Sequence, residues 1–399
     1  MFPDGVIVRS HLLSVPVDLV IAKSRIRFSN HVVVEIYADG VVGYGEGVLY
    51  RALPHQVGNA FRQFTQARPL IDLPVEREKW LSWIHTLLPN IPGLAQALDA
   101  ARWDLIGQQQ QLPLVELLGG AQRMSVPVTE QIFIRDWPVA ERELDEILGH
   151  GTQRLKVKIG AGPERDLETI RRLRAHVGPH VDIRIDANHA YSLEQSRVLY
   201  RELADLGVTA LEEPLVVRDW AGLRALRREI GLPIILDESI MTHEHLAEAI
   251  QKEAIDVLNL KLSRVGGLTQ ALDYARICRQ YGIGVCMGCS EDLGLGTAAI
   301  VHLAAALPHL VSTEGLGPQR LGFDIVLPEW QIVDGALTVP QQPGLGVTLR
   351  PRWQQDLPLH IRCFDLAQPD GRLLVYSHYV RWFQRANNVL WRTRSKVGI

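Results

Sequence analysis

Arg154-Leu155-Lys156-Val157-Lys158 is the first of five short apolar runs that each end on a charged residue. The other runs are Val181 to Asp186, Val208 to Glu212, Ile234 to Asp237 and Val257 to Lys261. The intervals between the terminal charges, from Lys158 through Asp186, Glu212 and Asp237 to Lys261, are 28, 26, 25 and 24 residues. Each interval fits one strand, one helix and two loops, so the charges recur once per β/α unit. This stretch therefore predicts an α/β barrel.

The strand direction of such a barrel brings the five charges together. All strands of a parallel barrel point the same way, so residues at successive strand ends meet on one rim, where these barrels carry their chemistry. Lys158 and Lys261 would then face three carboxylates, those of Asp186, Glu212 and Asp237. We predict an active site at this rim.

Three carboxylates that converge on one point repel one another unless a cation lies between them. An all-oxygen ligand set suits a hard divalent ion, so we predict Mg2+, with Mn2+ as the alternative. The two lysines come from strands on either side of the acids, which would place two amines on opposite sides of a bound substrate. The matching reaction removes a proton next to a carboxylate while the metal stabilises the enediolate oxygens.

Lys156 lies two residues before Lys158 and therefore on the same strand face. A lysine acts as a base only when it is neutral, and a second ammonium nearby lowers its pKa toward that state. We expect Lys156 to have this effect on Lys158.

Each charged residue also has a purely structural interpretation. Lysines and acids at strand ends are often solvated, Asp-Ala-Asn (186–188) could open a helix, and Glu-Glu-Pro (212–214) could form a turn. Five such features in succession at one repeat length are much harder to explain in this way. The pattern as a whole favours a site.

Motifs in this stretch resemble signatures of the enolase superfamily, and more narrowly of its muconate lactonizing enzyme subgroup. They are Leu-Lys-Val-Lys-Ile-Gly (155–160), Arg-Ile-Asp-Ala-Asn (184–188), Leu-Glu-Glu-Pro-Leu (211–215), Leu-Asp-Glu-Ser (236–239) and Asn-Leu-Lys-Leu-Ser-Arg-Val-Gly-Gly (259–267). The resemblance implies a modified TIM barrel of (β/α)7β type with an N-terminal α+β capping domain, and a homo-oligomer. It also implies Mg2+ bound by Asp186, Glu212 and Asp237, with Lys158 and Lys261 as acid and base. Pairing a Lys or His base with magnesium is the general pattern of that superfamily.

Length and composition limit the functional classes. The chain of 399 residues has material for two or three domains, and its formal net charge of −3 gives no reason to expect nucleic acid or an anionic membrane as partner. No apolar run reaches the roughly 18 residues of a membrane span. The N-terminus lacks the basic start and cleavage site of a signal peptide. We therefore expect a cytoplasmic protein.

The four cysteines are too few for a disulfide scaffold. Cys-Met-Gly-Cys (286–289) matches a redox or zinc spacing. Because no second Cys/His pair accompanies it, we favour buried structural thiols.

The first part of the chain has the pattern of an α+β domain. Val6 to Leu13, His31 to Tyr37 and Val41 to Glu46 predict an antiparallel sheet with a hairpin turn at Asp39-Gly40. Segments 15–27 and 48–55 contain prolines and look irregular; they could cap the barrel mouth or be ordinary surface loops. Helical periodicity follows over 56–64, 75–88 and 95–107.

We divide the chain into four parts. These are a capping domain over 1–123, the barrel over 124–325, a return to the cap over 326–349, and a basic tail over 350–399. The tail holds nine Lys or Arg against three Asp and falls outside the resemblance. It could bind an anionic surface or partner, or form a small packed extension, and we favour the extension.

Four polar residues near strand ends are predicted substrate contacts: Asn188, Glu238, Glu291 and Glu314. Dipeptide epimerases of the resembled family carry an Asp-x-Asp that binds an ammonium group where this chain has Glu314-Gly315-Leu316. Losing one of two carboxylates there forfeits part of a charge-assisted interaction worth roughly 1.5–3 kcal/mol. The run 312–318 is closer to that of muconate cycloisomerases.

The leading hypothesis is a Mg2+-dependent isomerase of a small carboxylate substrate. It would be a cycloisomerase, or a racemase or epimerase, including epimerases of dipeptides or N-acylamino acids. A dehydratase or a succinylbenzoate-synthase-type lyase is the second class, because the same enediolate could expel a β-hydroxyl. A non-catalytic binding protein on a barrel scaffold is the third, and retention of both lysines and all three acids argues against it.

Overall fold

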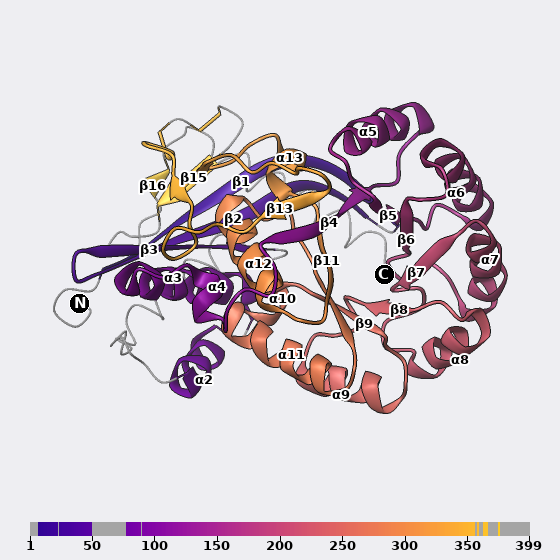
Figure 1. Cartoon of the computed structure of the whole chain (residues 1–399), viewed down its shortest axis with the longest axis horizontal. Helices are drawn as coiled ribbons and strands as arrows, with labels where there is room; N and C mark the ends of the chain where they lie inside the picture. The colour runs from indigo at the N-terminus through magenta and orange to yellow at the C-terminus, as the bar shows by residue number, and fades with distance from the viewer. Residues whose placement is uncertain are drawn as a thin grey trace, which may run out of the picture.

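The computed structural model describes residues 7–22, 24–49, 77–88, 90–355, 357–358, 362–365 and 374–375. Its centre is a sheet of parallel strands: β4 (Ser125–Ile132), β5 (Arg154–Lys158), β6 (Asp182–Asp186), β7 (Val208–Glu212), β8 (Ile234–Leu236), β9 (Val257–Leu260), β10 (Gly284–Met287) and β11 (Leu310–Glu314). The sheet closes on itself because β11 pairs with β10 on one side and with β4 on the other. The predicted α/β barrel is therefore confirmed, and it is visible in Figure 1.

Helices connect these strands and surround the barrel (Figure 1). They are α5 (Trp137–Gly149), α6 (Pro163–Val177), α7 (Leu193–Asp205), α8 (Trp220–Ile230), α9 (His243–Gln251), α10 (Leu262–Val265), α11 (Leu268–Gln280), α12 (Gly294–Ala306) and α13 (Gly317–Leu321). Local signals set their ends: Ser192 and Gln195 form a capping box at the start of α7. Each helix turns apolar residues inward, as Leu199 and Leu203 of α7 show by their burial.

The N-terminal part forms the predicted α+β cap. Its sheet contains β1 (Ile7–Ile21), β2 (Ser24–Ala38) and β3 (Val41–Val48), and its helices are α2 (Arg77–Leu87), α3 (Pro92–Gln110) and α4 (Leu114–Leu117). Gly43, Gly45 and Gly47 lie on the face of β3 that meets α3, so that the helix backbone approaches the strand directly. The helices predicted over 75–88 and 95–107 correspond to α2 and α3. The helix predicted over 56–64 lies outside the described residues, as does most of segment 48–55.

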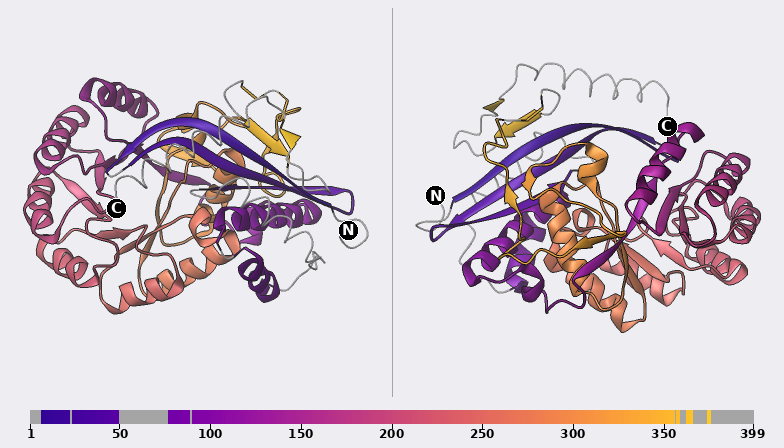
Figure 2. Two further views of the ribbon diagram at one scale, coloured as in Figure 1. Left: turned by 180° about the vertical axis from the view of Figure 1, so that it is seen from behind. Right: turned by 45° about the horizontal axis from the view of Figure 1, so that its top comes forward.

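The irregular structure expected over residues 15–27 is wrong. β1 and β2 continue as one long hairpin, with a shift of register between Pro16 and Leu19. The hairpin tip reaches the barrel, because the Ile134 amide donates to the Val20 carbonyl at 3.3 Å. Ala22 also lies against Gly160, just after β5, where no side chain larger than hydrogen fits. Figure 2 shows the hairpin arching from the cap to the barrel.

The C-terminal return contains β12 (Val326–Leu327), β13 (Ala336–Thr338) and β14 (Thr348–Leu349). β13 pairs antiparallel with barrel strand β4, while the Leu345 amide donates to Asp104 of α3 at 2.7 Å. The return segment therefore contacts both barrel and cap.

Two short strands of the basic tail extend the cap sheet. β15 (Arg362–Asp365) pairs antiparallel with β1, and β16 (Leu374–Val375) pairs with β15. For the tail residues that the structure describes, this pairing supports the packed extension.

Two further expectations can be compared with the structure. Cys278, Cys286 and Cys289 are buried free thiols, as predicted. Across the described ranges, no helix has both the length and the apolar character required to cross a bilayer.

Replacing Gly45 by alanine should destabilise the cap. The added Cβ would fall inside van der Waals contact of the Ala97 carbonyl oxygen and the Ala101 nitrogen, which are backbone atoms of α3 that cannot rotate away. Such overpacking costs about 1–3 kcal/mol in the free energy of unfolding. Urea denaturation measures it. Gly149→Ala is the matched control, because nothing lies within 4 Å of its added Cβ; equal stability of the two variants would contradict the prediction.

Candidate active site

The charged side chains at the barrel mouth come from neighbouring strands in matched register. Lys158 of β5 pairs with Asp186 of β6, and Asp186 pairs with Glu212 of β7. Asp237 follows β8, and Lys261 follows β9. The five predicted residues thus form one arc along consecutive strand ends, with a lysine at each end.

A second layer of polar side chains lies one step deeper in the barrel. Side chains alternate along a strand, so the residue two positions earlier also points inward. Lys156, Arg184 and Asn259 occupy these positions, two residues before Lys158, Asp186 and Lys261 respectively. All three are buried.

Each predicted metal ligand is paired with a cation in this structure. Asp186 Oδ2 accepts from Lys158 Nζ at 2.5 Å, and Glu212 Oε1 accepts from Lys156 Nζ at 3.0 Å. Lys156 Nζ also lies 3.6 Å from Asp186 Oδ2, so one ammonium joins the first two acids. Asp237 Oδ2 accepts from Lys261 Nζ at 2.8 Å, and Arg264 contacts its other oxygen.

The acidity of the three carboxyl groups differs. Burial opposes ionisation of Asp186, but the charges of Lys158 and Lys156 outweigh it and lower its pKa. Arg264 and Lys261 likewise lower the pKa of Asp237 against its burial. Burial and the charge of Asp186 raise the pKa of Glu212 to about 7, against the opposing charge of Lys156.

Glu212 is therefore a carboxylate short of positive charge. Its Oε2 atom is buried without a hydrogen-bond partner among the described residues, the nearest cation being Arg184 Nε at 3.6 Å. An unpartnered buried carboxylate oxygen between two further acids is what an oxygen-liganded divalent cation requires. The residues present fit Mg2+.

Lys156 is held as the second ammonium that its predicted effect on Lys158 requires, and that effect stays a prediction. Its burial would favour the neutral amine, yet the charges of Glu212, Glu314 and Asp186 prevail and raise its pKa well above the ordinary value. The Lys156 ammonium contacts all three of these carboxylates. It is a fixed cation that holds the acids together.

Glu314, a predicted substrate contact, lies at the centre of this deeper layer. Besides Lys156, it accepts hydrogen bonds from Arg184 Nη2 at 2.9 Å and Asn259 Nδ2 at 2.9 Å. Gln131 Nε2 and the Cys289 amide also donate to it, at 3.0 and 3.1 Å. Its carboxylate is fully used by the barrel itself.

The other predicted substrate contacts are paired as well. Glu291 accepts from Arg320 Nε at 2.5 Å, on the loop after β10. Asn188 donates to Glu238 Oε1 at 3.0 Å and accepts from Lys158 Nζ at 3.1 Å. Asn188 is thus the predicted contact that touches a predicted acid/base group directly.

His189, Glu213 and Glu238 form a neighbouring cluster that the sequence did not reveal. Among the described residues, this is the group of three potential ligands whose atoms lie within 4.8 Å of one another. The predicted trio does not meet that criterion, since its oxygens are turned to the lysines. However, His189 Nδ1 donates to the Leu215 carbonyl at 2.9 Å, so this nitrogen is not available as a metal ligand. The other ring nitrogen, Nε2, lies 3.5 Å from Glu238 Oε2. His189 thus lies between two acids and is a partner of theirs rather than a metal ligand.

The ionisation of this cluster supports that description. Burial works against a charged His189, but the contact with Glu238 and the charge of Glu213 raise its pKa to about 9. Burial and the charge of Glu238 raise the pKa of Glu213 to about 8, against the charge of His189. Glu213 also accepts from the amides of Asp237 and Ser239, both at 2.7 Å. The cluster therefore orients the turn that carries Asp237.

Sequence reasoning missed Arg184, Asn259 and Arg264, although two of them had a readable signal. Arg184 and Asn259 each precede a rim residue by two positions, which is the strand period. Arg264 had no such signal in the sequence, because its contact with Asp237 depends on the turn between β9 and α10.

Lys156→Met should lower stability far more than Lys158→Met. Removing Lys156 leaves Glu212 and Glu314 buried without the positive charge that they share. This should lower the free energy of unfolding by about 3–5 kcal/mol. Removing Lys158 leaves Asp186 in contact with Lys156, so the loss should be smaller. Urea denaturation without Mg2+ compares the two; equal losses would show that Lys156 is not the central cation.

His189→Asn should lose stability in a pH-dependent way. The pKa of His189 is raised from 6.5 to about 9 in the folded protein, so its contribution is complete below about pH 6.5 and disappears as pH rises through about 9. Denaturation of both proteins without Mg2+ from pH 6 to 10 should show the stability difference shrinking over that window. The exposed His180→Asn serves as control, and a difference that grows with pH would refute the assignment.

Comparison with known proteins places this geometry in a family. The description "Mandelate racemase / muconate lactonizing enzyme, N-terminal domain" matches residues 5–119, and "Enolase C-terminal domain-like" matches residues 139–353. A hydrophobic dipeptide epimerase of Enterococcus faecalis is 32% identical over 322 residues, which cover 77% of this chain and 88% of that protein. A chloromuconate cycloisomerase of Pseudomonas sp. strain P51 is 30% identical over 345 residues, covering 80% and 89% respectively.

Solved structures agree with this. The crystal structure of a dipeptide epimerase from Enterococcus faecalis, complexed with Mg and the dipeptide L-Leu-L-Tyr, matches with a TM-score of 0.80 at 29% identity. The match covers 87% of this chain and 100% of that chain. The chain belongs to the enolase superfamily, in its mandelate racemase and muconate lactonizing enzyme group.

Proposed function

We propose that this isomerase uses Lys158 and Lys261 as an acid/base pair that moves a proton at the carbon next to a substrate carboxylate. The observation that supports this is the arc of strand ends. Lys158 Nζ contacts Asp186 at one end, at 2.5 Å, and Lys261 Nζ contacts Asp237 at the other, at 2.8 Å. A substrate carboxylate held above the acids would have one amine on each side. One lysine would remove the proton and the other would return it to the opposite face.

Asp186, Glu212 and Asp237 would hold Mg2+ in this proposal. The all-oxygen donor set and the unpartnered Glu212 Oε2 support it. When bound, the ion supplies positive charge that stabilises the enediolate oxygens. Lys156 contacts Glu212 and Asp186, and Glu213 holds the Asp237 turn.

The charge balance of the site favours an anionic substrate. The two layers contain five cations, Lys156, Lys158, Arg184, Lys261 and Arg264, and four acids, Asp186, Glu212, Asp237 and Glu314. The neighbouring cluster adds His189 against Glu213 and Glu238, so the charges of the site nearly balance. A bound divalent cation would leave a positive surplus. A substrate that brings at least one carboxylate restores the balance.

The same contacts disfavour a substrate with a free ammonium group. Glu314, Glu291 and Glu238 are each engaged by an arginine, a lysine or an amide of this chain. Gly315 and Leu316 add no acid. We therefore propose racemisation or epimerisation of an N-acylated amino acid, in which the ammonium charge is masked.

Cycloisomerisation of a muconate-like diacid is the second candidate. It is favoured by the sequence after the last barrel strand, where Thr313-Glu314 and Gly317-Pro318 resemble muconate cycloisomerases. It is also favoured by the similarity to a chloromuconate cycloisomerase. This reaction needs one lysine as acid, whereas racemisation needs both.

Isotope exchange should distinguish the lysines. With an N-acylamino acid, Mg2+ and heavy water, the wild type should place deuterium at the α-carbon of both enantiomers, as read by mass and optical rotation. Lys158→Ala should block exchange from one enantiomer and Lys261→Ala from the other, each by about 10²- to 10⁴-fold. Chelation of Mg2+ should abolish both exchanges.

Controls separate the alternatives. Lys252→Ala, an exposed lysine, should leave exchange unchanged. Formation of a lactone from muconate without any epimer would favour the second candidate, and loss of water from a sugar acid would favour the lyase. Undiminished exchange in either active-site variant would end the proposal.

Cytoplasmic location and a homo-oligomeric state, both expected from the sequence, stay predictions. Size-exclusion chromatography with light scattering measures the second.

A further inference from the structure

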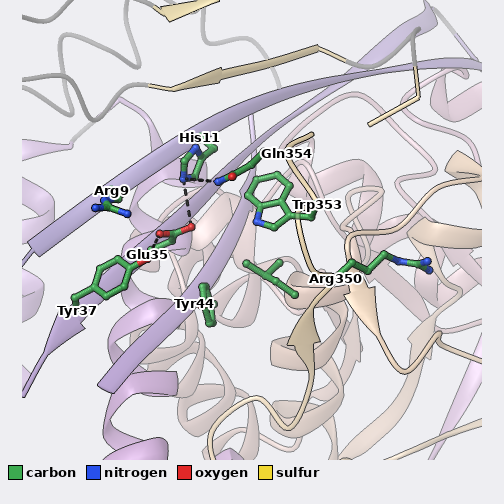
Figure 3. A pocket seen from close by; sticks show the side chains of 9 residues that line it. Arg9, His11, Glu35, Tyr37, Tyr44, Arg350, Trp353 and Gln354 are labelled. Carbon is green, nitrogen blue, oxygen red and sulfur yellow. Dashed lines mark hydrogen bonds and ion pairs between the residues drawn. The ribbon is translucent and has the colours of Figure 1, made fainter. Parts of the chain in front are cut away.

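A cavity of about 370 Å³ lies in the cap, away from the barrel mouth. Its walls are the first half of β1, the second half of β2, the start of β3 and the segment that follows β14 (Figure 3). The strand register aligns Arg9 with Glu35 and Glu35 with Tyr44, so these three side chains form one row across the sheet. Trp353 closes the row from the C-terminal segment.

This cavity is distinct from the active site. The hairpin runs from Arg9 at the cavity to Ile21 near Gly160, a span of about 40 Å for an extended strand. No residue of the barrel arc lines it. Its volume falls in the range of small-molecule sites.

The one carboxylate among the side chains of this row is already satisfied. Glu35 Oε1 lies 3.3 Å from His11 Nε2, and Glu35 Oε2 accepts from the Tyr37 hydroxyl at 2.5 Å. Burial alone would raise the pKa of Glu35, but these two hydrogen bonds outweigh it and keep the group ionised. The Glu35 carboxylate is thus bonded to other residues of the cavity wall. A cationic ligand would have to compete with His11 and Tyr37 for it.

Donors, in contrast, remain available. The Arg9 guanidinium lies 5.2 Å from the centroid of the Tyr37 ring and has no carboxylate partner in the part of the chain that the structure describes. The Tyr44 hydroxyl likewise makes no hydrogen bond to a described residue, whereas the Tyr44 amide donates to Asp104. Figure 3 shows Arg350 turned away, and that side chain is paired with Glu329 at 2.8 Å. A guanidinium with free N–H groups recognises a carboxylate.

Aromatic side chains form part of the remaining walls. The Trp353 indole meets His11 edge to face, with centroids 5.4 Å apart and planes at 88°. Trp353 is mostly buried, whereas Tyr37 and Tyr44 are half-buried on the sheet. Rings of this kind accept a planar ligand by stacking.

We propose that this cavity binds a small planar organic anion, with its carboxylate on Arg9 and its ring against Tyr44 and Trp353. The occupant would be a ligand separate from the substrate. It would tie the C-terminal segment to the cap sheet, because Trp353 comes from one and Arg9 from the other.

The test uses 4-fluorobenzoate as probe and the full chain with Mg2+. Fluorine NMR and calorimetry measure its affinity for the wild type, Arg9→Gln and Tyr44→Phe. Arg27→Gln is the matched control, an exposed arginine of β2 outside the cavity. Lys158→Ala reports binding in the barrel, and 4-fluorobenzamide and 4-fluorobenzylamine replace the anion by a neutral group and a cation.

The expected result is saturable binding that weakens on the order of tenfold in Arg9→Gln, as a lost charge-assisted hydrogen bond predicts. Tyr44→Phe should weaken it less, Arg27→Gln should leave it unchanged, and the Arg9-dependent binding should persist in Lys158→Ala. The amide should bind more weakly than the acid. The proposal is overturned by the absence of saturable binding, by full affinity in Arg9→Gln, by loss of binding in Lys158→Ala, or by tighter binding of the amine.

Discussion

The structure depends on how the barrel compensates acids that it buries away from water. Burying an unpaired carboxylate costs several kcal/mol, so each acid needs a partner within the barrel. Glu314 receives Lys156, Arg184, Asn259, Gln131 and a backbone amide, and it is complete. Glu212 shares two of these donors but keeps one oxygen without a hydrogen bond. The deeper layer is thus structural, and the unpartnered Glu212 oxygen remains available to a cation.

The barrel and its rim were predictable because a parallel barrel imposes a period on the sequence. Strand ends that share a rim must recur once per β/α unit, so Lys158, Asp186, Glu212, Asp237 and Lys261 could be read from spacing alone. The hydrogen-bond partners of the side chains at the barrel mouth could not be predicted in this way. Glu291 meets Arg320 because α13 folds back over the loop after β10, and the sequence holds no period that links these two positions. The contact of Lys156 with Glu314 could not be predicted for the same reason, since Glu314 comes from the last barrel strand.

The long hairpin illustrates a second limit. Pro16 suggested a loop, because a proline lacks the N–H that a central strand needs. In the structure β15 pairs with β1 at residues 11–14, so at Pro16 only β2 pairs with β1 and that side of the strand is an edge. Pro16 fits into β1 because it lies at an edge of the sheet. That edge depends on where β15 ends, and β15 lies about 350 residues later in the chain.

Cap and barrel are joined by a carboxylate as well as by apolar contacts. Glu46 of β3 is bonded to His31 at 2.9 Å and accepts from the amides of Leu293 and Gly296, at 2.6 and 2.9 Å. These amides belong to the first turn of α12, whose positive end favours a negative charge. The cap thereby fixes the helix that follows the β10 loop, and with it one side of the barrel mouth.

The strand that the tail adds to β1 also limits how copies of this protein can associate. An uncovered edge strand offers unpaired amides and carbonyls to any neighbouring chain, and a very short terminal strand offers little. Among the described residues, β15 covers β1 along His11–Ser14, and beyond β15 lies β16, two residues long. Along His11–Ser14, a second copy therefore cannot add its own strand to β1 to form one continuous sheet.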